Sequence, residues 1–119
     1  MKIIYSNKKV EKQCSSIKEA KKLFGGSDIL VENLMSKINI IKNAEVLKDI
    51  IVMPPMHFHK LNGKLNGFFA VDVKSRRDKW RIIMQPLDEF EGEYIPCNID
   101  EIAEYVRIVR IEEVSQHYE

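Results

Sequence analysis

The chain has 119 residues, of which 45% are hydrophobic and 31% charged, and its formal net charge is +1. Residues 1–119 are therefore predicted to form a single globular domain, large enough to bury a core without disulfides. No apolar run approaches the ~18 residues that a membrane span needs, and the N-terminus lacks the apolar region of a signal peptide. We expect a cytoplasmic protein that does not enter a membrane.

The first quarter of the chain predicts one strand followed by helical structure. Residues 2–6 are apolar and β-branched, as in a strand. Asn7 can cap a helix, because apolar residues recur at helical spacing over 10–24. The serine pair at 15–16 is a point at which this helix could divide into two. Two glycines at 25–26 end the pattern.

A second helix is predicted to begin after Ser27 or Asp28. Its apolar stripe consists of Leu30, Leu34, Ile38 and Ile41. Beyond Asn43 the sequence permits either a short helical turn or an apolar crossover, which Pro54 and Pro55 end.

The second half of the chain has an apolar period of two. Strands are predicted at 56–61, 68–73, 80–85 and 105–111, with turns at 62–67 and 74–79 and a helical turn at 98–106. This order predicts an α+β fold, in which two N-terminal helices pack on one face of a twisted, mainly antiparallel sheet of four to five strands. The other face is expected to be at least partly open, and a ligand would bind there.

The charges are unevenly distributed along the chain. Residues 57–84 carry seven Lys or Arg and two acids, whereas residues 87–104 carry seven acids and no Lys or Arg. A near-neutral total can therefore conceal a basic surface that attracts polyanions, although both blocks are also consistent with ordinary solvated faces.

The histidines do not complete a recognisable metal site. His57 and His59 would point to one face of a strand, but the remaining ligands would have to come from His117, Cys97 or a carboxylate at no familiar spacing. We predict no metal and no cofactor. Phosphate-binding glycine loops and a GxSxG nucleophile motif are also missing. Cys14 and Cys97 form no CxxC pattern and are predicted to be free thiols rather than a disulfide or a catalytic Cys–His pair.

Nucleic-acid binding fits the basic residues better. Antiparallel pairing would bring together side chains that are distant in sequence. The candidates for RNA or phosphate contact are Lys60, Lys64, Lys74, Arg76, Arg77 and Lys79, near His59 and Arg81. Phe68, Phe69 and Trp80 lie among them, and we expect core packing for these aromatics rather than base stacking.

Arg81 lies in the middle of an apolar strand and cannot be buried without a partner. Either it pairs with an acid such as Asp72, or it points into an anion site. His117 and Tyr118, which follow the last predicted strand, are residue types that transfer a proton or donate a hydrogen bond to an oxyanion.

Taken in order, these features resemble the RelE/ParE toxin superfamily, and above all its HigB branch, over essentially the whole chain. HigB toxins carry the series "HPLKGDR.G.WSI…WRI…EDYH". The matching positions are His59, Leu61, Gly63, Gly67, Phe69–Val71, Trp80–Ile82 and Gln116–Glu119.

The resemblance implies a RelE-like fold and a type II toxin that is a ribosome-dependent, metal-independent endoribonuclease. Such an enzyme cleaves translated mRNA by attack of a ribose 2′-hydroxyl on the adjacent phosphate. It also implies a helix-turn-helix, HigA-like antitoxin and a heterotetramer of the pair. The implied catalytic residues are His59, Arg81, His117 and Tyr118, with Arg81 stabilising the phosphorane.

Three departures from the HigB pattern affect this assignment. Asn62 replaces the family's lysine, and Lys60 or Lys64 could supply its charge. The acid and histidine of the tail appear in exchanged order as His117 and Glu119. An acidic insertion at 87–104 precedes the last strand. Two alternatives stay open, namely a ParE-like inhibitor of DNA gyrase and a non-catalytic nucleic-acid-binding module.

Overall fold

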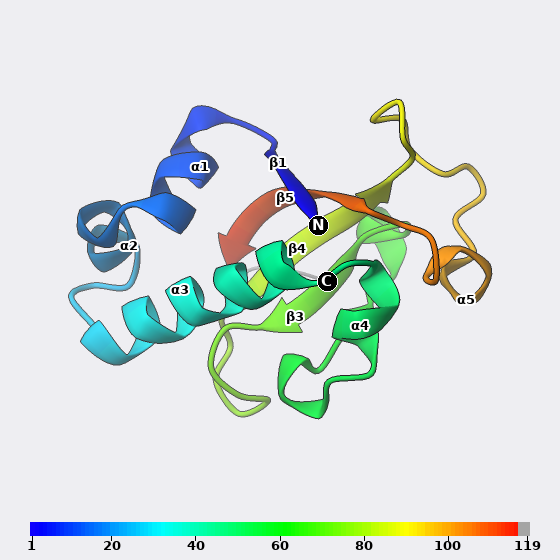
Figure 1. Ribbon diagram of the computed structural model, residues 1–119. Coiled ribbons are helices and arrows are strands. Elements are labelled where there is room, and N and C mark those ends of the chain that lie inside the picture. Colours follow the sequence, from blue (N-terminus) through cyan, green and yellow to red (C-terminus); the bar gives the residue numbers. More distant parts are fainter. Residues whose placement is uncertain (117–119) are drawn as a thin grey trace.

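The computed structural model describes residues 1–116, and residues 117–119 lie outside the described part. A five-stranded sheet in the order β1-β5-β4-β3-β2 carries the three N-terminal helices on one face (Figure 1). The strands are β1 (Lys2–Tyr5), β2 (His59–Lys60), β3 (Phe69–Asp72), β4 (Arg81–Leu87) and β5 (Ile108–Ser115). The helices are α1 (Lys8–Ser15), α2 (Ile17–Leu23), α3 (Asp28–Asn43), α4 (Leu47–Ile51) and α5 (Ile99–Ile102), with 3-10 turns at Pro54–Met56 and Gly63–Leu65. The predicted α+β fold is confirmed.

Each N-terminal helix begins at a side-chain cap. Asn7 accepts a hydrogen bond from the Val10 amide at 3.0 Å, and Ser27 accepts one from the Leu30 amide at 3.3 Å. Ser16 caps α2 in the same way, so the serine pair does divide the first predicted helix into two. The structure therefore has three N-terminal helices where the sequence predicted two.

The sheet is antiparallel except at one edge. β1 pairs with β5 in parallel, whereas β2, β3, β4 and β5 pair antiparallel in turn. Alternate residues of β3 and β4 face the helices, among them Val71 and Ile82, and pack with Leu34 and Ile41 of α3 in the main core. The side chains between them, including Asp72 and Arg81, are placed on the opposite face.

That opposite face is partly covered by the chain itself. The segment between β2 and β3 folds back, so that Leu61, Leu65 and Phe68 pack on Ala70 and Ile83 in a second apolar cluster. The glycine-rich stretch at 62–67 is therefore a 3-10 turn with a packing function as well as a hairpin connection. All residues of β3 and β4 are buried, so the face that was expected to be at least partly open is closed over these two strands. The half-buried His57 and His59 lie at its edge.

The predicted strand at 56–61 is much shorter in the structure. Pro54 and Pro55 open a 3-10 turn, and His57 follows it with a left-handed backbone, at φ 47°. Only His59 and Lys60 pair with β3. His57 and His59 therefore come together through a bend, and not because they share one face of a strand.

Both cysteines are free thiols, as predicted. Burial raises the pKa of Cys14 to about 12. The unfolded thiol ionises near its ordinary pKa, so between roughly pH 9 and 12 the unfolded state binds fewer protons than the folded state. The contribution of the Cys14 thiol to the free energy of unfolding is therefore fully present below pH 9. It falls as the pH rises through this range, by up to about 1.4 kcal/mol per pH unit.

Cys14→Ala should therefore flatten the alkaline decline in the free energy of unfolding, measured by urea denaturation at a series of pH values. Cys97→Ala, at a more exposed thiol, is the matched control and should change the slope less. Equal slopes for Cys14→Ala and the unaltered protein would contradict the prediction. Tyr5, whose pKa burial raises to about 12, contributes a decline of the same sign in every variant.

Among residues 1–116, no helix is both long enough and apolar enough to cross a membrane.

Candidate functional site

Four polar side chains meet at the end of β3 on the face away from the helices. We call them the Asp72 cluster: His57, His59, Asp72 and Arg81. Asp72 and Arg81 are paired across β3 and β4, and the two histidines come from the bend before β2 and from β2 itself. Their imidazole rings lie 4.7 Å apart between centroids.

The Asp72 carboxylate is the centre of this cluster, and its side chain is only 1% exposed. One oxygen, Oδ1, lies 3.1 Å from Arg81 Nε and 3.0 Å from His57 Nδ1. Of the two alternatives that the sequence left open for Arg81, the pairing with Asp72 is the one observed. A buried carboxylate is stable as an ion only with such partners, so these two contacts hold a negative charge inside the fold.

Lys37 approaches the same strand end from the helix side. Its Nζ donates to the backbone carbonyls of Asp72 at 2.8 Å and Val73 at 3.2 Å. Burial lowers the pKa of Lys37, the nearby Asp72 carboxylate opposes that shift, and Arg81 adds to it. The end of β3 is therefore fixed by a lysine from one side and by an arginine from the other.

The Arg81 guanidinium holds the connection between β3 and β4, which we call the basic loop (residues 74–79). Its nitrogens donate to the backbone carbonyls of Ser75 (3.3 Å), Arg76 (3.1 Å), Asp78 and Trp80 (2.9 Å). The Arg81 side chain is only 6% exposed. Its observed contacts are structural, because they link three carbonyls of the loop and that of Trp80 to the buried carboxylate.

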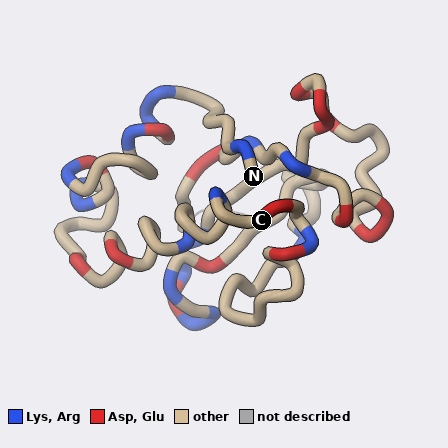
Figure 2. Tube along the Cα trace, viewed as in Figure 1, with Lys and Arg blue, Asp and Glu red and all other residues tan. Residues whose placement is uncertain are grey.

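The basic loop presents its charges to solvent. Lys74, Arg76, Arg77 and Lys79 are all exposed, and Figure 2 shows Lys and Arg gathered on this loop between β3 and β4. Lys60 and Lys64 are also exposed. Lys60 is paired with Phe69, roughly 10 Å along β3 from Asp72, and Lys64 lies in the 3-10 turn that follows β2. The predicted phosphate-binding residues thus divide into two groups, and the loop group is the one whose backbone is bonded by Arg81 of the Asp72 cluster.

His59 is held in a defined orientation. Its Nδ1 lies 2.8 Å from the His57 carbonyl oxygen, so Nδ1 carries the proton in that contact and the Nε2 lone pair remains available in the neutral ring. The side chain is half-buried. A histidine fixed in this way can accept a proton through Nε2, or donate one once it is charged.

The comparisons with known proteins were made on sequence and on structure. No family model matches the sequence, and no curated protein matches it. A solved YoeB/ParE toxin from Agrobacterium tumefaciens is similar to this structure with a TM-score of 0.52, covering 99% of this chain and 100% of that chain at 13% identity. This chain has the fold of a YoeB/ParE toxin. At 13% identity the likeness concerns the fold alone, and the HigB subtype stays a prediction.

Within this toxin fold, the predicted aromatics have structural positions. Phe69 is buried and stacks on Phe58, with ring centroids 5.1 Å apart. Trp80 packs edge-on against Phe24 at 4.9 Å. Phe68 covers the second apolar cluster. All three pack against the core, as expected from the sequence.

Two members of the Asp72 cluster were not singled out as site residues by the sequence. His57 was assigned to the scaffold and Asp72 only to an ion pair, yet ligand atoms of His57, His59 and Asp72 lie within 4.8 Å of one another. Asp72 is the third potential metal ligand that sequence spacing did not reveal. Its Oδ1 is already engaged by Arg81 and His57. The absence of a metal therefore stays a prediction.

His117 and Tyr118, the other predicted catalytic residues, lie outside the described residues. β5 ends at Ser115, which is paired with Arg81. The last described part of the chain thus reaches the Asp72 end of the sheet.

Proposed function

We propose that this chain is the toxin of a type II toxin–antitoxin pair and cleaves translated mRNA. The observation that carries the proposal is the toxin fold over 99% of the chain, combined with an oriented histidine and an exposed basic loop at the sheet face away from the helices. RNA offers that face a polyanionic backbone, and the loop supplies the cations that such a backbone requires.

The proposed reaction is attack of a ribose 2′-oxygen on the adjacent phosphorus, which breaks the bond to the leaving 5′-oxygen. One proton leaves the 2′-hydroxyl and one reaches the 5′-oxygen, so the step needs a base and an acid but no metal. His59 is proposed to transfer one of these protons through Nε2. His117 and Tyr118 are proposed to take the remaining proton-transfer and positioning roles.

The cations of the site would act in two ways. Exposed side chains of the basic loop would contact phosphates directly, whereas Arg81 is bonded to the backbone of that loop. Direct stabilisation of the phosphorane by Arg81, as the HigB resemblance implies, would require its guanidinium to release carbonyls of the loop. Arg81 would otherwise act by holding the loop in place.

The partner is proposed to be an antitoxin of the helix-turn-helix class, in a heterotetramer with this toxin, and the substrate to be mRNA on the ribosome. A reading frame for such a protein next to this gene would support the pair. Co-expression should then abolish the growth arrest that the toxin alone causes. Growth arrest that the neighbouring protein does not relieve would contradict the proposed pair.

A ParE-like inhibitor of DNA gyrase is the second candidate, because the matched toxin is described as YoeB/ParE. One pair of assays distinguishes mRNA cleavage from gyrase inhibition. After induction, primer extension on cellular mRNA should show new 5′ ends within translated regions. Purified protein should leave gyrase supercoiling unchanged. Inhibited supercoiling with intact mRNA would favour the ParE-like function, and binding of nucleic acid with neither effect would favour a non-catalytic module.

Charge reversal in the basic loop should weaken binding to mRNA-bearing ribosomes. Arg76→Glu with Arg77→Glu removes two exposed cations while leaving intact the backbone carbonyl that Arg81 bonds. We expect about tenfold weaker binding in co-sedimentation at low salt, and a shallower dependence on salt concentration. The free energy of unfolding should change by no more than about 0.5 kcal/mol.

The matched control is Lys8→Glu with Lys9→Glu at the start of α1, where both side chains are exposed but distant from the Asp72 cluster. It carries the same change in net charge. Equal weakening by both pairs would show that the loop has no special part in binding.

A further inference from the structure

The segment between β4 and β5 forms a pocket that the proposed RNA chemistry does not use. Its volume is about 530 Å³, within the range of ligand sites, and its lining consists of Leu87, Asp88, Glu89, Tyr94, Tyr105, Arg107 and Ile108. Leu87 and Ile108 are paired at the far end of β4 and β5 from Arg81. Arg81 and Leu87 are six residue steps apart along β4, so roughly 20 Å of strand separates the pocket from the Asp72 cluster.

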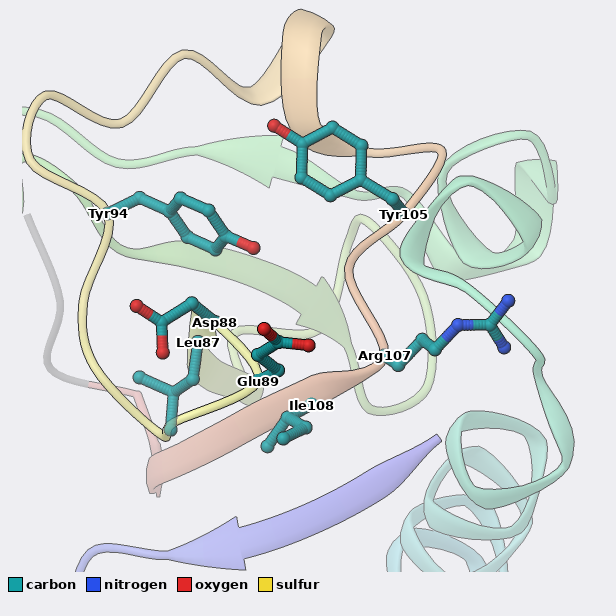
Figure 3. Close-up of a pocket in the computed structure, with 7 residues that line it drawn as sticks. All are labelled: Leu87, Asp88, Glu89, Tyr94, Tyr105, Arg107 and Ile108. Carbon is teal, nitrogen blue, oxygen red and sulfur yellow. The ribbon is translucent and has the colours of Figure 1, made fainter.

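The rings of two tyrosines form the sides of this pocket. Figure 3 shows Tyr94 and Tyr105 on opposite sides of the opening, with Leu87 and Ile108 below them and the carboxylates of Asp88 and Glu89 beneath the rings. The ring centroids are 6.5 Å apart, and the planes are inclined at 60°. Two aromatic rings and two carboxylates that line one pocket are groups that attract a cation.

The only cationic residue of the lining is turned away. Figure 3 shows the Arg107 guanidinium pointing out of the pocket, and its Nη1 lies 3.6 Å from Glu45 instead. Asp88 is fixed by its own turn, where Oδ1 accepts hydrogen bonds from the amides of Phe90 and Gly92. Within residues 1–116, Glu89 has no ion-pair partner. The pocket thus keeps a negative charge that the fold does not neutralise.

The surroundings add to that negative potential, although two acids of the segment have cationic partners, Glu91 in Lys2 and Glu93 in Arg110. Figure 2 shows Asp and Glu gathered on the segment between β4 and β5, which carries seven acids and no Lys or Arg over 87–104. Burial raises the pKa of Tyr94, and Tyr105, Asp88, Cys97 and Glu89 raise it further. A nucleic-acid backbone would be repelled here. The complementary ligand is a cation attached to something apolar.

The apolar part of such a ligand also has a matching surface. Phe90 is 86% exposed and Ile95 is 87% exposed, both on the same acidic segment. Large apolar side chains that stand free beside a pocket are typical of a protein–protein contact. We propose that this pocket, the tyrosine pocket, receives an arginine side chain from an apolar-flanked peptide segment of a partner protein.

Arginine is the cation that fits best. Its planar guanidinium stacks on aromatic rings and can bond a carboxylate through two nitrogens, whereas an ammonium offers only a point charge. The site lies apart from the Asp72 cluster, so the inference does not depend on RNA cleavage. A protein that cleaves no RNA could still bind the peptide, and one that cleaves RNA could fail to bind it.

The test uses two synthetic tripeptides, acetyl-Leu-Arg-Leu-amide and the same peptide with citrulline, which keeps the shape of arginine without its charge. Titration into the full-length ¹⁵N-labelled protein should shift the amide signals of the pocket residues saturably. The citrulline peptide should bind about threefold to tenfold more weakly, as expected for the loss of a cation–π contact and an exposed ion pair.

Two variants locate the binding. Glu89→Gln should weaken binding of the arginine peptide about threefold or more. Glu101 is an exposed acid of the same segment outside the pocket lining, so Glu101→Gln should leave the affinity for the peptide unchanged. Equal affinity for the two peptides, equal weakening by both variants, or no saturable shift of the pocket signals would overturn the proposal.

Discussion

Arg81→Ala is expected to lower the free energy of unfolding by about 3–5 kcal/mol. The substitution leaves the Asp72 carboxylate, only 1% exposed, without its Arg81 contact at 3.1 Å. It also removes the donor from four backbone carbonyls of the basic loop and its ends. Removing one partner of a buried ion pair costs more than the pair itself contributes, because a buried charge is left behind. Urea denaturation followed by Trp80 fluorescence would measure the loss.

Two further variants test this reason for the loss. Arg81→Ala combined with Asp72→Ala should cost less than the sum of the single changes, by about 0.5–3 kcal/mol, since no charge is then stranded. Arg107→Ala removes an exposed arginine that lies 3.6 Å from Glu45, and should cost no more than about 1 kcal/mol. The buried-pair explanation would be contradicted if the losses in free energy of unfolding of Arg81→Ala and Asp72→Ala were additive. It would also be contradicted if Arg81→Ala and Arg107→Ala lost the same amount.

This stability effect changes how the function must be tested. An inactive Arg81→Ala protein is expected whether Arg81 contacts the phosphorane or only holds the basic loop. Activity therefore has to be divided by the folded fraction, and the charge reversal at Arg76 and Arg77, which spares the buried pair, is the cleaner probe of RNA contact. Full cleavage by correctly folded Arg81→Ala would exclude both roles.

Much of the fold was predictable because its signals are local. Asn7 and Ser27 are capping residues at helix starts, and the apolar stripe of residues 30–41 has the period of a helix. The alternation over 80–85 likewise separated Trp80, Ile82 and Met84, which pack in the main core, from Arg81 and Ile83 on the other face, although that face is buried too. These patterns depend only on neighbours within a few residues, so no tertiary information was needed.

The site was less predictable because it depends on long-range contacts. The sequence offered Asp72 as one of two alternatives for Arg81, the other being an anion site, and the structure shows the ion pair. The sequence could not show that Arg81 also binds four backbone carbonyls, because carbonyl groups leave no trace in residue identity. The sequence pattern also predicted a strand at His57. In the structure, the left-handed bend after Pro54–Met56 brings the His57 imidazole to Asp72 instead. The tyrosine pocket joins Tyr94 and Tyr105 from either side of α5, at no recognisable spacing.

The largest effect on the proposed activity is expected at His59. His59→Gln should reduce mRNA cleavage about 10²–10⁴-fold, the usual contribution of a positioned acid or base. Glutamine retains a polar side chain of similar reach but cannot exchange a proton near neutral pH. His59 is half-buried, and its one fixed contact is with the His57 carbonyl oxygen. We therefore expect the folded fraction to change little, and cleavage would be measured by primer extension in a translating extract.

His57→Gln is the informative companion, because it keeps the backbone carbonyl that orients His59 while removing the imidazole that contacts Asp72 and packs beside the His59 ring. If His57 is scaffold, this variant should lose stability and retain most of its cleavage per folded molecule. Lys18→Ala on the exposed face of α2 should change neither quantity. Full cleavage by His59→Gln would remove His59 from the reaction. Loss of cleavage by His57→Gln at unchanged stability would transfer the proton-transfer role to the His57–Asp72 pair.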